Sequence, residues 1–211
     1  MTDATYLDSG ETGVIERLLA GDETAFMMLV EMYQSAMLRI ARMYTPDRQL
    51  AEEAVQETWL AVLQGLSRFE RRSSLKTWIF SILINRARSA AQREGRYQMQ
   101  FELVEEPTIE PDRFQTQGQN IGHWKVHPQD WETVPEATLL SQEVRQIIQS
   151  AITQLPPQQR EVITLRDVEG LDAEQVCNLL TLSDGNQRVL LHRARATVRR
   201  GIETYLSDQD R

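Results

Sequence analysis

Apolar residues recur every three to four positions through most of the first hundred residues, which predicts amphipathic helices. Breaks at Gly21, Pro46 and Gly65 divide this stretch, and Asp22 and Asp47 have the side-chain chemistry of helix N-caps. The predicted helices cover about 12–20, 22–41, 47–66 and 75–91, the last with Ser73 or Ser74 as its cap. Because no segment alternates with a period of two, an all-α domain is expected over 12–96, after a flexible tail at 1–11.

The periodic pattern stops after Gly95 and returns near Glu136. Residues 97–135 are rich in Gln, Glu, Pro and Gly, which is typical of a flexible linker. A second small helical domain is predicted over 136–206, followed by a tail at 207–211. Its last part has Asp172 as a cap, a short helix, a break at 181–183 and a long helix from about Asp184, which together indicate a helix-turn-helix.

The net charge of −8 is unusual for a nucleic-acid-binding protein, but the charge is segregated along the chain. Residues 1–60 carry 4 basic and 11 acidic side chains, whereas 68–96 carry 8 basic and 2 acidic ones. The linker is acidic again, and 186–200 contains 5 arginines and no acid. Phosphate attraction should be confined to these two basic segments, so binding of DNA by the free chain should be weak and salt-dependent.

Several classes of protein are excluded or disfavoured by what the sequence lacks. We expect a cytoplasmic protein without membrane insertion, because neither a signal peptide nor a membrane-spanning run is apparent. Cys177 is the single cysteine, so an internal disulfide cannot form. His123 and His127 have a metal-ligand spacing, but Gly122 and Pro128 oppose a helix there and no third ligand is apparent. No phosphate loop or nucleophile elbow occurs, so we predict neither an enzyme nor a cofactor.

The two basic segments suit different forms of DNA. In the last helix, Leu191, Ala194 and Val198 form an apolar face, while the first turn carries Asn and Arg side chains suited to base edges. The segment around 69–97 combines cations with aromatic residues, a mixture suited to single strands, and its loop at 69–74 is the better candidate for contact with an extruded base. For the last helix, the alternative interpretation is an amphipathic helix with a solvated basic face. For the segment around 69–97, the alternative is that Trp78 and Phe80 simply belong to the core.

Four stretches of sequence resemble one family, the extracytoplasmic-function sigma factors of bacterial RNA polymerase. They are AEEAVQETWLAVL at 51–63, FERRSSLKTWIFSILINRA at 69–87, LPPQQREVITLRDVEGL at 155–171 and GNQRVLLHRAR at 185–195. The resemblance implies an N-terminal four-helix domain of the sigma region 2 type and a C-terminal helix-turn-helix domain of the sigma region 4 type, joined by a flexible acidic linker. The expected partners are core RNA polymerase, promoter DNA as duplex and as melted strand, and an anti-sigma factor.

The resemblance also implies roles for individual residues. Polymerase binding is expected for Glu52, Glu53, Gln56, Glu57 and Trp59. The minus-ten DNA is expected to contact Phe69, Arg71, Arg72, Ser73, Ser74, Lys76, Thr77, Asn85, Arg86 and Arg88. The minus-thirty-five DNA is expected to contact Asn186, Gln187, Arg188, His192, Arg193, Arg195 and Arg199.

The departures from the family pattern bear on specificity more than on class. Leu83 and Ile84 replace a usual Ala-Arg pair, and Thr181 occupies a common glycine position. Asn186 and Gln187 stand in a recognition helix that usually carries other residues, so the promoter sequence cannot be transferred from relatives. The alternative function is a helix-turn-helix regulator that binds duplex DNA without polymerase, and binding to the core enzyme distinguishes the two.

Overall fold

The computed structural model describes residues 4–93 and 142–209, and the part of the chain so described is helical without a strand. The all-α prediction is therefore confirmed. The predicted linker at 97–135, including His123 and His127, lies outside the described residues, as do Leu139 and Leu140. Contacts divide the chain into two compact units, one of residues 1–99 with 169–183 and one of 100–168 with 184–211.

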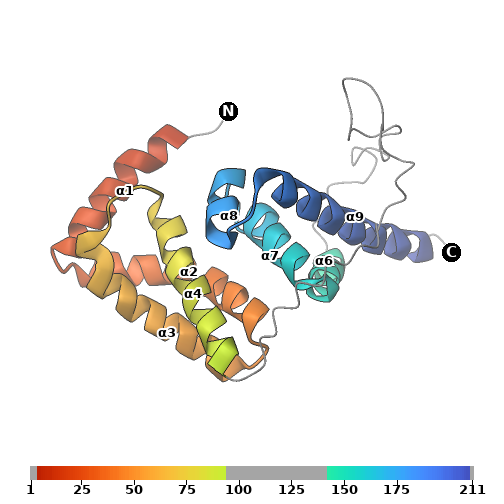
Figure 1. Cartoon of the computed structure of the whole chain (residues 1–211), viewed down its shortest axis with the longest axis horizontal. Coiled ribbons are helices and arrows are strands. Elements are labelled where there is room, and N and C mark those ends of the chain that lie inside the picture. Colours follow the sequence, from red (N-terminus) through yellow and green to blue (C-terminus); the bar gives the residue numbers. More distant parts are fainter. Residues whose placement is uncertain (1–3, 94–141, 210–211) are drawn as a thin grey trace. The chain divides into compact units, whose positions relative to one another are not determined.

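The N-terminal helices of the first unit are α1 (Ala4–Leu19), α2 (Glu23–Tyr44), α3 (Arg48–Gly65) and α4 (Leu75–Arg93), with a short 3₁₀ turn, η1 (Leu66–Arg68), after α3 (Figure 1). The α1 helix begins at Ala4, whereas the apolar pattern predicts a start near residue 12 after a flexible tail at 1–11. Asp22 accepts a hydrogen bond from the Ala25 amide at 3.1 Å, and Asp47 accepts one from the Gln49 amide at 2.8 Å. Both acidic N-caps predicted from the sequence are therefore present.

The core of this unit lies between α2, α3 and α4, which contact one another extensively. The largest fully buried side chains include Met37 and Ile40 of α2, Val55 of α3, and Ile79 and Phe80 of α4. Leu83 and Ile84, the two departures from the family pattern, are 0% and 1% exposed. Their apolar character is therefore used in packing and not at the surface.

Some positions that the periodicity placed inside are exposed. Leu19 and Leu63 stand at periodic apolar positions of the sequence, yet each is 51% exposed. The residues directly before them, Leu18 and Val62, are buried instead. A helix buries only part of its circumference, so apolar residues at the margin of the stripe can remain outside.

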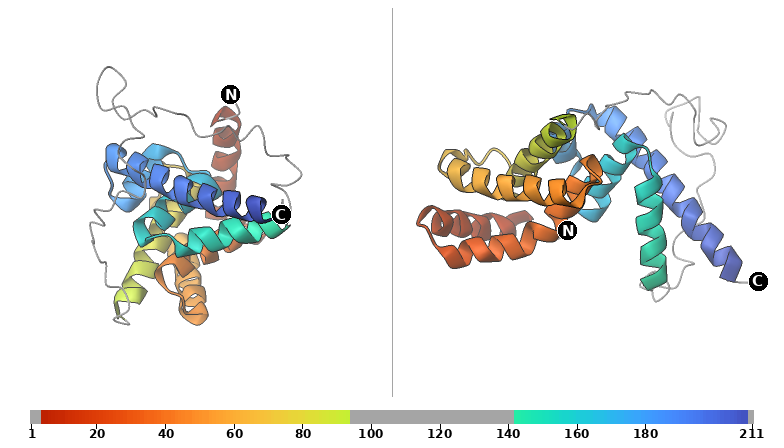
Figure 2. Two further views of the ribbon diagram at one scale, coloured as in Figure 1. Left: turned by 90° about the vertical axis from the view of Figure 1, so that its right-hand side faces the viewer. Right: turned by 90° about the horizontal axis from the view of Figure 1, so that it is seen from below.

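The second unit contains α6 (Gln142–Gln154), α7 (Pro157–Ile163) and α9 (Asp184–Gln209), and α9 packs against both of the others (Figure 2). After α7 the backbone continues as a π-helical segment, η4 (Thr164–Val168). Leu191, Ala194 and Val198 are buried, which confirms the predicted apolar face of the long helix. Buried partners from the earlier helices include Val144 and Val162.

The segment 169–183 of the first unit contains α8 (Ala173–Leu180). Asp172 accepts a hydrogen bond from the Gln175 amide at 2.8 Å, and the Gln175 side chain accepts one from the Asp172 amide at 3.0 Å. This reciprocal pair is a capping box, and it confirms the predicted cap. Thr181 ends the helix in the left-handed region, with φ 58° and ψ 46°.

The left-handed conformation of Thr181 generates a prediction about stability. A β-branched residue is strained there, whereas glycine is not, so Thr181→Gly should raise the free energy of unfolding by about 0.5–1 kcal/mol after the entropy of the more flexible unfolded chain is included. Urea denaturation followed by circular dichroism measures the change. Ser183→Gly is the matched control, since Ser183 is outside the positive-φ positions, and it should not stabilise. A lower free energy of unfolding for Thr181→Gly would contradict the interpretation that Thr181 is strained.

Candidate nucleic-acid and partner interfaces

The outward face of α3 carries a row of exposed residues at helical spacing. Glu53 and Gln56 are exposed, and Leu60 and Leu63, at the next positions of the same row, are 59% and 51% exposed. Spacings of three, four and three residues align these four side chains along one side of the helix. The row therefore joins two polar groups to two exposed leucines, and only the polar pair was predicted from the sequence.

The other expected polymerase-contacting residues of α3 have internal partners. Glu52 pairs with Arg48 at 2.7 Å, and Glu57 pairs with Arg86 of α4 at 2.8 Å. Trp59 was expected at the partner surface, but the structure places it in the core, 8% exposed. Its indole N–H donates to Gln34 at 3.0 Å, and its ring meets Phe26 edge to face at 5.7 Å. Trp59 thus holds α3 against α2.

The loop before α4 presents most of the residues expected at minus-ten DNA. Arg71, Arg72 and Ser73 are exposed, and Arg71 adopts a left-handed backbone with φ 57°. Phe69 packs against Trp78 with ring centroids 4.9 Å apart. The loop is therefore a cationic turn supported by an aromatic pair, a surface that can hold both phosphate and bases.

Two side chains fix the start of α4 directly after this loop. Ser74 Oγ accepts a hydrogen bond from the Thr77 amide at 3.1 Å, and the Glu11 carboxylate of α1 accepts one from the Leu75 amide. Thr77 was expected to contact DNA, but it is 6% exposed and its hydroxyl is 2.8 Å from Ser74 Oγ. This placement corrects the expectation, since Thr77 stabilises the helix start. The capping role of Glu11 could not be predicted from the sequence, because its partner Leu75 is 64 residues away along the chain.

Further along α4, the expected DNA-contacting residues differ in their surroundings. Asn85 is exposed, Arg86 pairs with Glu57, and the guanidinium of Arg88 lies 5.3 Å from the centre of the Tyr44 ring. Lys76 Nζ lies 5.6 Å from the centre of the Phe80 ring. The cations of this helix are therefore held in place by acids and aromatic rings before any DNA is bound.

The residues expected at minus-thirty-five DNA also divide into surface and interior. Asn186 is exposed and Arg188 is largely exposed, with its guanidinium 2.7 Å from Asp184. Gln187 was expected at the surface, but it is 1% exposed, and its amide nitrogen has no hydrogen-bond partner in the described structure. The structure corrects its position, because Gln187 lies one helical turn before Leu191, on the buried face of α9.

Arg195 is engaged by an acid of the same unit. Its guanidinium forms two hydrogen bonds with Asp167, at 2.8 and 2.7 Å, and Asp167 lies in the π-helical segment η4. This hydrogen bonding raises the pKa of Arg195 above its usual value. Arg193 and Arg199 are half-buried on the same helix. A DNA phosphate at Arg195 would therefore compete with a carboxylate.

Comparison with known proteins identifies the family of the chain. The models for sigma-70 region 2 and sigma-70 region 4 match residues 29–97 and 145–198. A probable RNA polymerase sigma factor of Haemophilus influenzae is 32% identical over 79% of this chain and 84% of its own length. The extracytoplasmic-function sigma-E factor of Escherichia coli K12 is 28% identical over 92% of this chain and 94% of its own length.

Two solved structures have a similar fold. CnrH, in complex with the cytosolic domain of CnrY, has a TM-score of 0.54 at 20% identity and covers 95% of this chain and 99% of its own. The sigma factor RpoE of Bartonella quintana, in complex with the anti-sigma factor NepR, has a TM-score of 0.54 at 22% identity, covering 84% of this chain and 96% of its own.

The chain belongs to the RNA polymerase sigma factors of the extracytoplasmic-function type. It is accordingly a transcription initiation factor that binds core polymerase and directs promoter recognition, and its family is not a class of enzymes. No described helix is both long and apolar enough to cross a membrane, and no described group of His, Cys, Asp and Glu could hold a metal.

The surroundings of His192 generate a prediction about pH. Partial burial lowers the pKa of His192 below its ordinary value of 6.5, and the cations of Arg199, Arg195 and Arg193 lower it further. The unfolded chain therefore takes up a proton at a higher pH than the folded chain. Stability should be fully present above pH 6.5 and should fall as the pH decreases through the lower, folded-state pKa.

Two measurements check this prediction. NMR titration of His192 should give a midpoint below 6.5, and Arg199→Gln should move that midpoint upward because it removes the largest of the three cationic contributions. Duplex DNA should also raise it by neutralising the arginines. A midpoint at or above 6.5 in the free protein would show that the side chain is not desolvated as described.

Proposed function

We propose that three surfaces of this chain make separate contacts during transcription initiation. The exposed row of α3 binds core polymerase, the loop 69–74 with the start of α4 binds the melted minus-ten strand, and the exposed first turn of α9 binds minus-thirty-five duplex. The family assignment supports the overall function, and the exposure of particular side chains supports the assignment of each surface.

The row on α3 carries this proposal. Exposed leucines are costly to leave in water, and exposed apolar groups beside polar ones are typical of protein–protein interfaces. Leu60 and Leu63 continue the line of Glu53 and Gln56, so a partner helix could cover all four together. We therefore extend the polymerase-binding surface to these leucines and treat Trp59 as a residue that positions α3.

For the minus-ten strand, the exposed Arg71, Arg72 and Ser73 are the strongest candidates. The left-handed backbone of Arg71 is strained, and such conformations persist only where the surrounding structure enforces them. Because they cluster at functional sites, this strain supports a binding role for the loop. For the minus-thirty-five duplex, Asn186 and Arg188 are the candidates for base contact, and Gln187 contributes packing.

The remaining expectations follow from the class of protein. We propose a non-catalytic cytoplasmic protein whose activity is controlled by an anti-sigma factor, since the solved relatives RpoE and CnrH are described in complexes and the former complex contains one. A regulator that binds duplex DNA without polymerase would leave the α3 row and the loop 69–74 without a function.

Charge reversal on α3 tests polymerase binding. Glu53→Arg with Gln56→Arg should reduce affinity for the core enzyme at least about a hundredfold, because two cations replace groups at the centre of the interface. Glu16→Arg with Thr24→Arg adds the same charge at exposed positions of α1 and α2 and is the control. Fluorescence anisotropy of the labelled protein measures binding, and unchanged affinity in the α3 variant would exclude this row.

Alanine substitution in α9 tests base recognition. In a reconstituted holoenzyme that selects promoters from a random library, Arg188→Ala and Asn186→Ala should each cost about 1–3 kcal/mol of discrimination at one minus-thirty-five position. Gln187→Ala should alter thermal stability and leave the selected sequence unchanged. If all three substitutions together preserved promoter selectivity, the first turn of α9 would not be the base-contacting surface.

A further inference from the structure

Glu169 is a charged residue that the structure buries. It is 8% exposed, and its carboxylate accepts a hydrogen bond from Arg39 Nε of α2 at 2.8 Å. Its backbone carbonyl oxygen accepts a hydrogen bond from Lys76 Nζ of α4. Two cations from two helices therefore converge on one residue of the segment 169–183, within the first compact unit.

One of the two cations, Lys76, belongs to the surface that we assign to the minus-ten strand. Lys76 is in the first turn of α4, directly after the loop 69–74, and the resemblance to sigma factors already places it at DNA. Arg39 was not expected at DNA, because it lies in the amphipathic helix α2, outside the two basic segments of the sequence. Its side chain is 39% exposed even with Glu169 on it, so it is accessible to a ligand.

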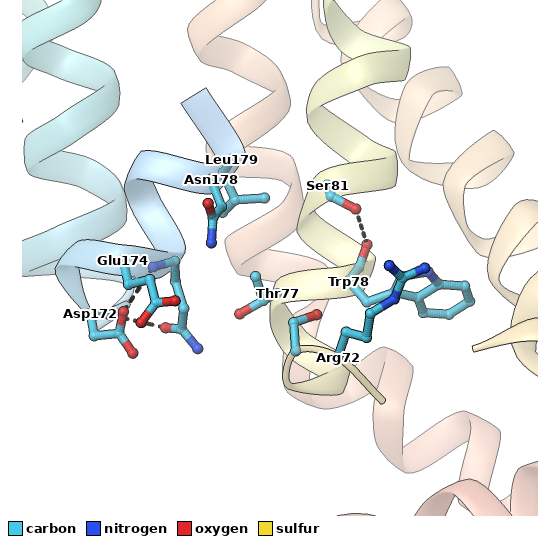
Figure 3. Close-up of a pocket in the computed structure, with 10 residues that line it drawn as sticks. Arg72, Thr77, Trp78, Ser81, Asp172, Glu174, Asn178 and Leu179 are labelled. Atoms are coloured by element: carbon cyan, nitrogen blue, oxygen red, sulfur yellow. Dashed lines mark hydrogen bonds between the residues drawn. The ribbon is translucent and has the colours of Figure 1, made fainter. Parts of the chain in front are cut away.

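The rest of the segment covers the same surface. The helix α8 contacts α4, and a pocket lies where they meet (Figure 3). One side is lined by Arg72, Ser73, Thr77, Trp78 and Ser81, and the other by Asp172, Glu174, Gln175, Asn178 and Leu179. Arg72 therefore shares a pocket with two carboxylates of the α8 segment. An acidic element thus lies beside residues expected to contact DNA, although Arg72 and Ser73 themselves remain exposed.

The chemistry of this contact is that of an anion site. A carboxylate and a phosphate both accept charge-assisted hydrogen bonds from guanidinium and ammonium groups. A carboxylate as buried as Glu169 is tolerated because it is paired. Arg39 contacts the carboxylate and Lys76 contacts the backbone carbonyl oxygen of Glu169, so displacement of the whole residue would free both cations, and the backbone of a DNA strand would supply the replacement anion.

We propose that Arg39 and Lys76 form a phosphate-binding pair for the melted minus-ten strand, and that Glu169 occupies this pair until promoter DNA replaces it. The proposal rests on the proposed function of the loop 69–74 and adds to it a DNA-contacting residue, Arg39, and an internal competitor. Gly170, with φ 70°, makes the turn that links Glu169 to the α8 segment.

Binding of single-stranded DNA by the free, full-length protein tests the competition. The probe is a fluorescently labelled strand of mixed sequence, measured by anisotropy over a series of salt concentrations. Glu169→Gln should bind roughly tenfold more tightly than the unmodified protein, because a charged competitor has been removed. Glu23→Gln, an exposed carboxamide substitution on α2, changes net charge equally and should have little effect.

Arg39→Ala tests the binding pair itself. Combined with Glu169→Gln, it should abolish the gain in affinity and reduce the slope of log affinity against log salt by about 0.7, the value for one phosphate contact on a single strand. Circular dichroism confirms that each variant is folded. If Glu169→Gln binds DNA no better than Glu23→Gln, or if Arg39→Ala leaves its affinity and salt slope unchanged, the proposal is overturned.

A distance measurement tests the covering of the pocket. Spin labels at Ser81→Cys and Asn178→Cys, in a Cys177→Ser background, should give one short distance in the otherwise unmodified protein. Glu169→Gln, or addition of core polymerase with promoter DNA, should replace it with longer distances. A short distance that persists in both conditions would overturn the proposal.

Transcription by the reconstituted holoenzyme separates this proposal from the proposed function. Glu169→Gln should initiate as well as the unmodified protein, whereas Arg39→Ala should initiate less. If the unmodified protein neither binds core enzyme nor initiates, the proposed function fails whatever the DNA-binding results. If it initiates normally and Arg39→Ala initiates equally well, only the present proposal fails.

Discussion

Packing of α4 against α2 and α3 is the constraint on which the surfaces that we propose for promoter and polymerase in the first unit depend. Ile79, Phe80, Leu83 and Ile84 bury one face of α4, so the opposite face and the preceding loop are held at the surface. The same packing aligns α3, because Trp59 is held by Phe26 and Gln34 of α2. Two binding surfaces thus share one apolar core, and neither requires a separate scaffold.

Ion pairs impose a second constraint, because they engage several of the basic side chains with acids of the same chain. Arg86 is paired with Glu57, Arg195 with Asp167, and Arg39 with Glu169. Each pair places an acid on a cation of a helix that we propose to bind DNA, or of a helix packed beside it. A phosphate would have to displace that acid, so we expect the attraction of the free protein for DNA to be weaker than the number of arginines indicates.

Much of the fold was predictable from neighbouring residues. The helices, the caps at Asp22, Asp47 and Asp172, and the buried face of α9 all follow from local spacing and were found as expected. The site was less predictable at the level of single residues. Thr77 and Gln187 are polar and lie within basic segments, yet both are buried. Composition marks a segment as a DNA-contacting one, but it does not distinguish the side chains that face outward.

The sequence by itself determined the class of this protein, its helices and the two basic segments, because periodicity, capping and charge depend on residues close together along the chain. Only the tertiary structure revealed that Leu60 and Leu63 extend the row on α3, that Glu11 caps α4, and that Glu169 lies on Arg39, 130 residues away. Contacts between distant residues depend on how helices pack, and packing follows from the three-dimensional fit of side chains and not from the order of residues along the chain.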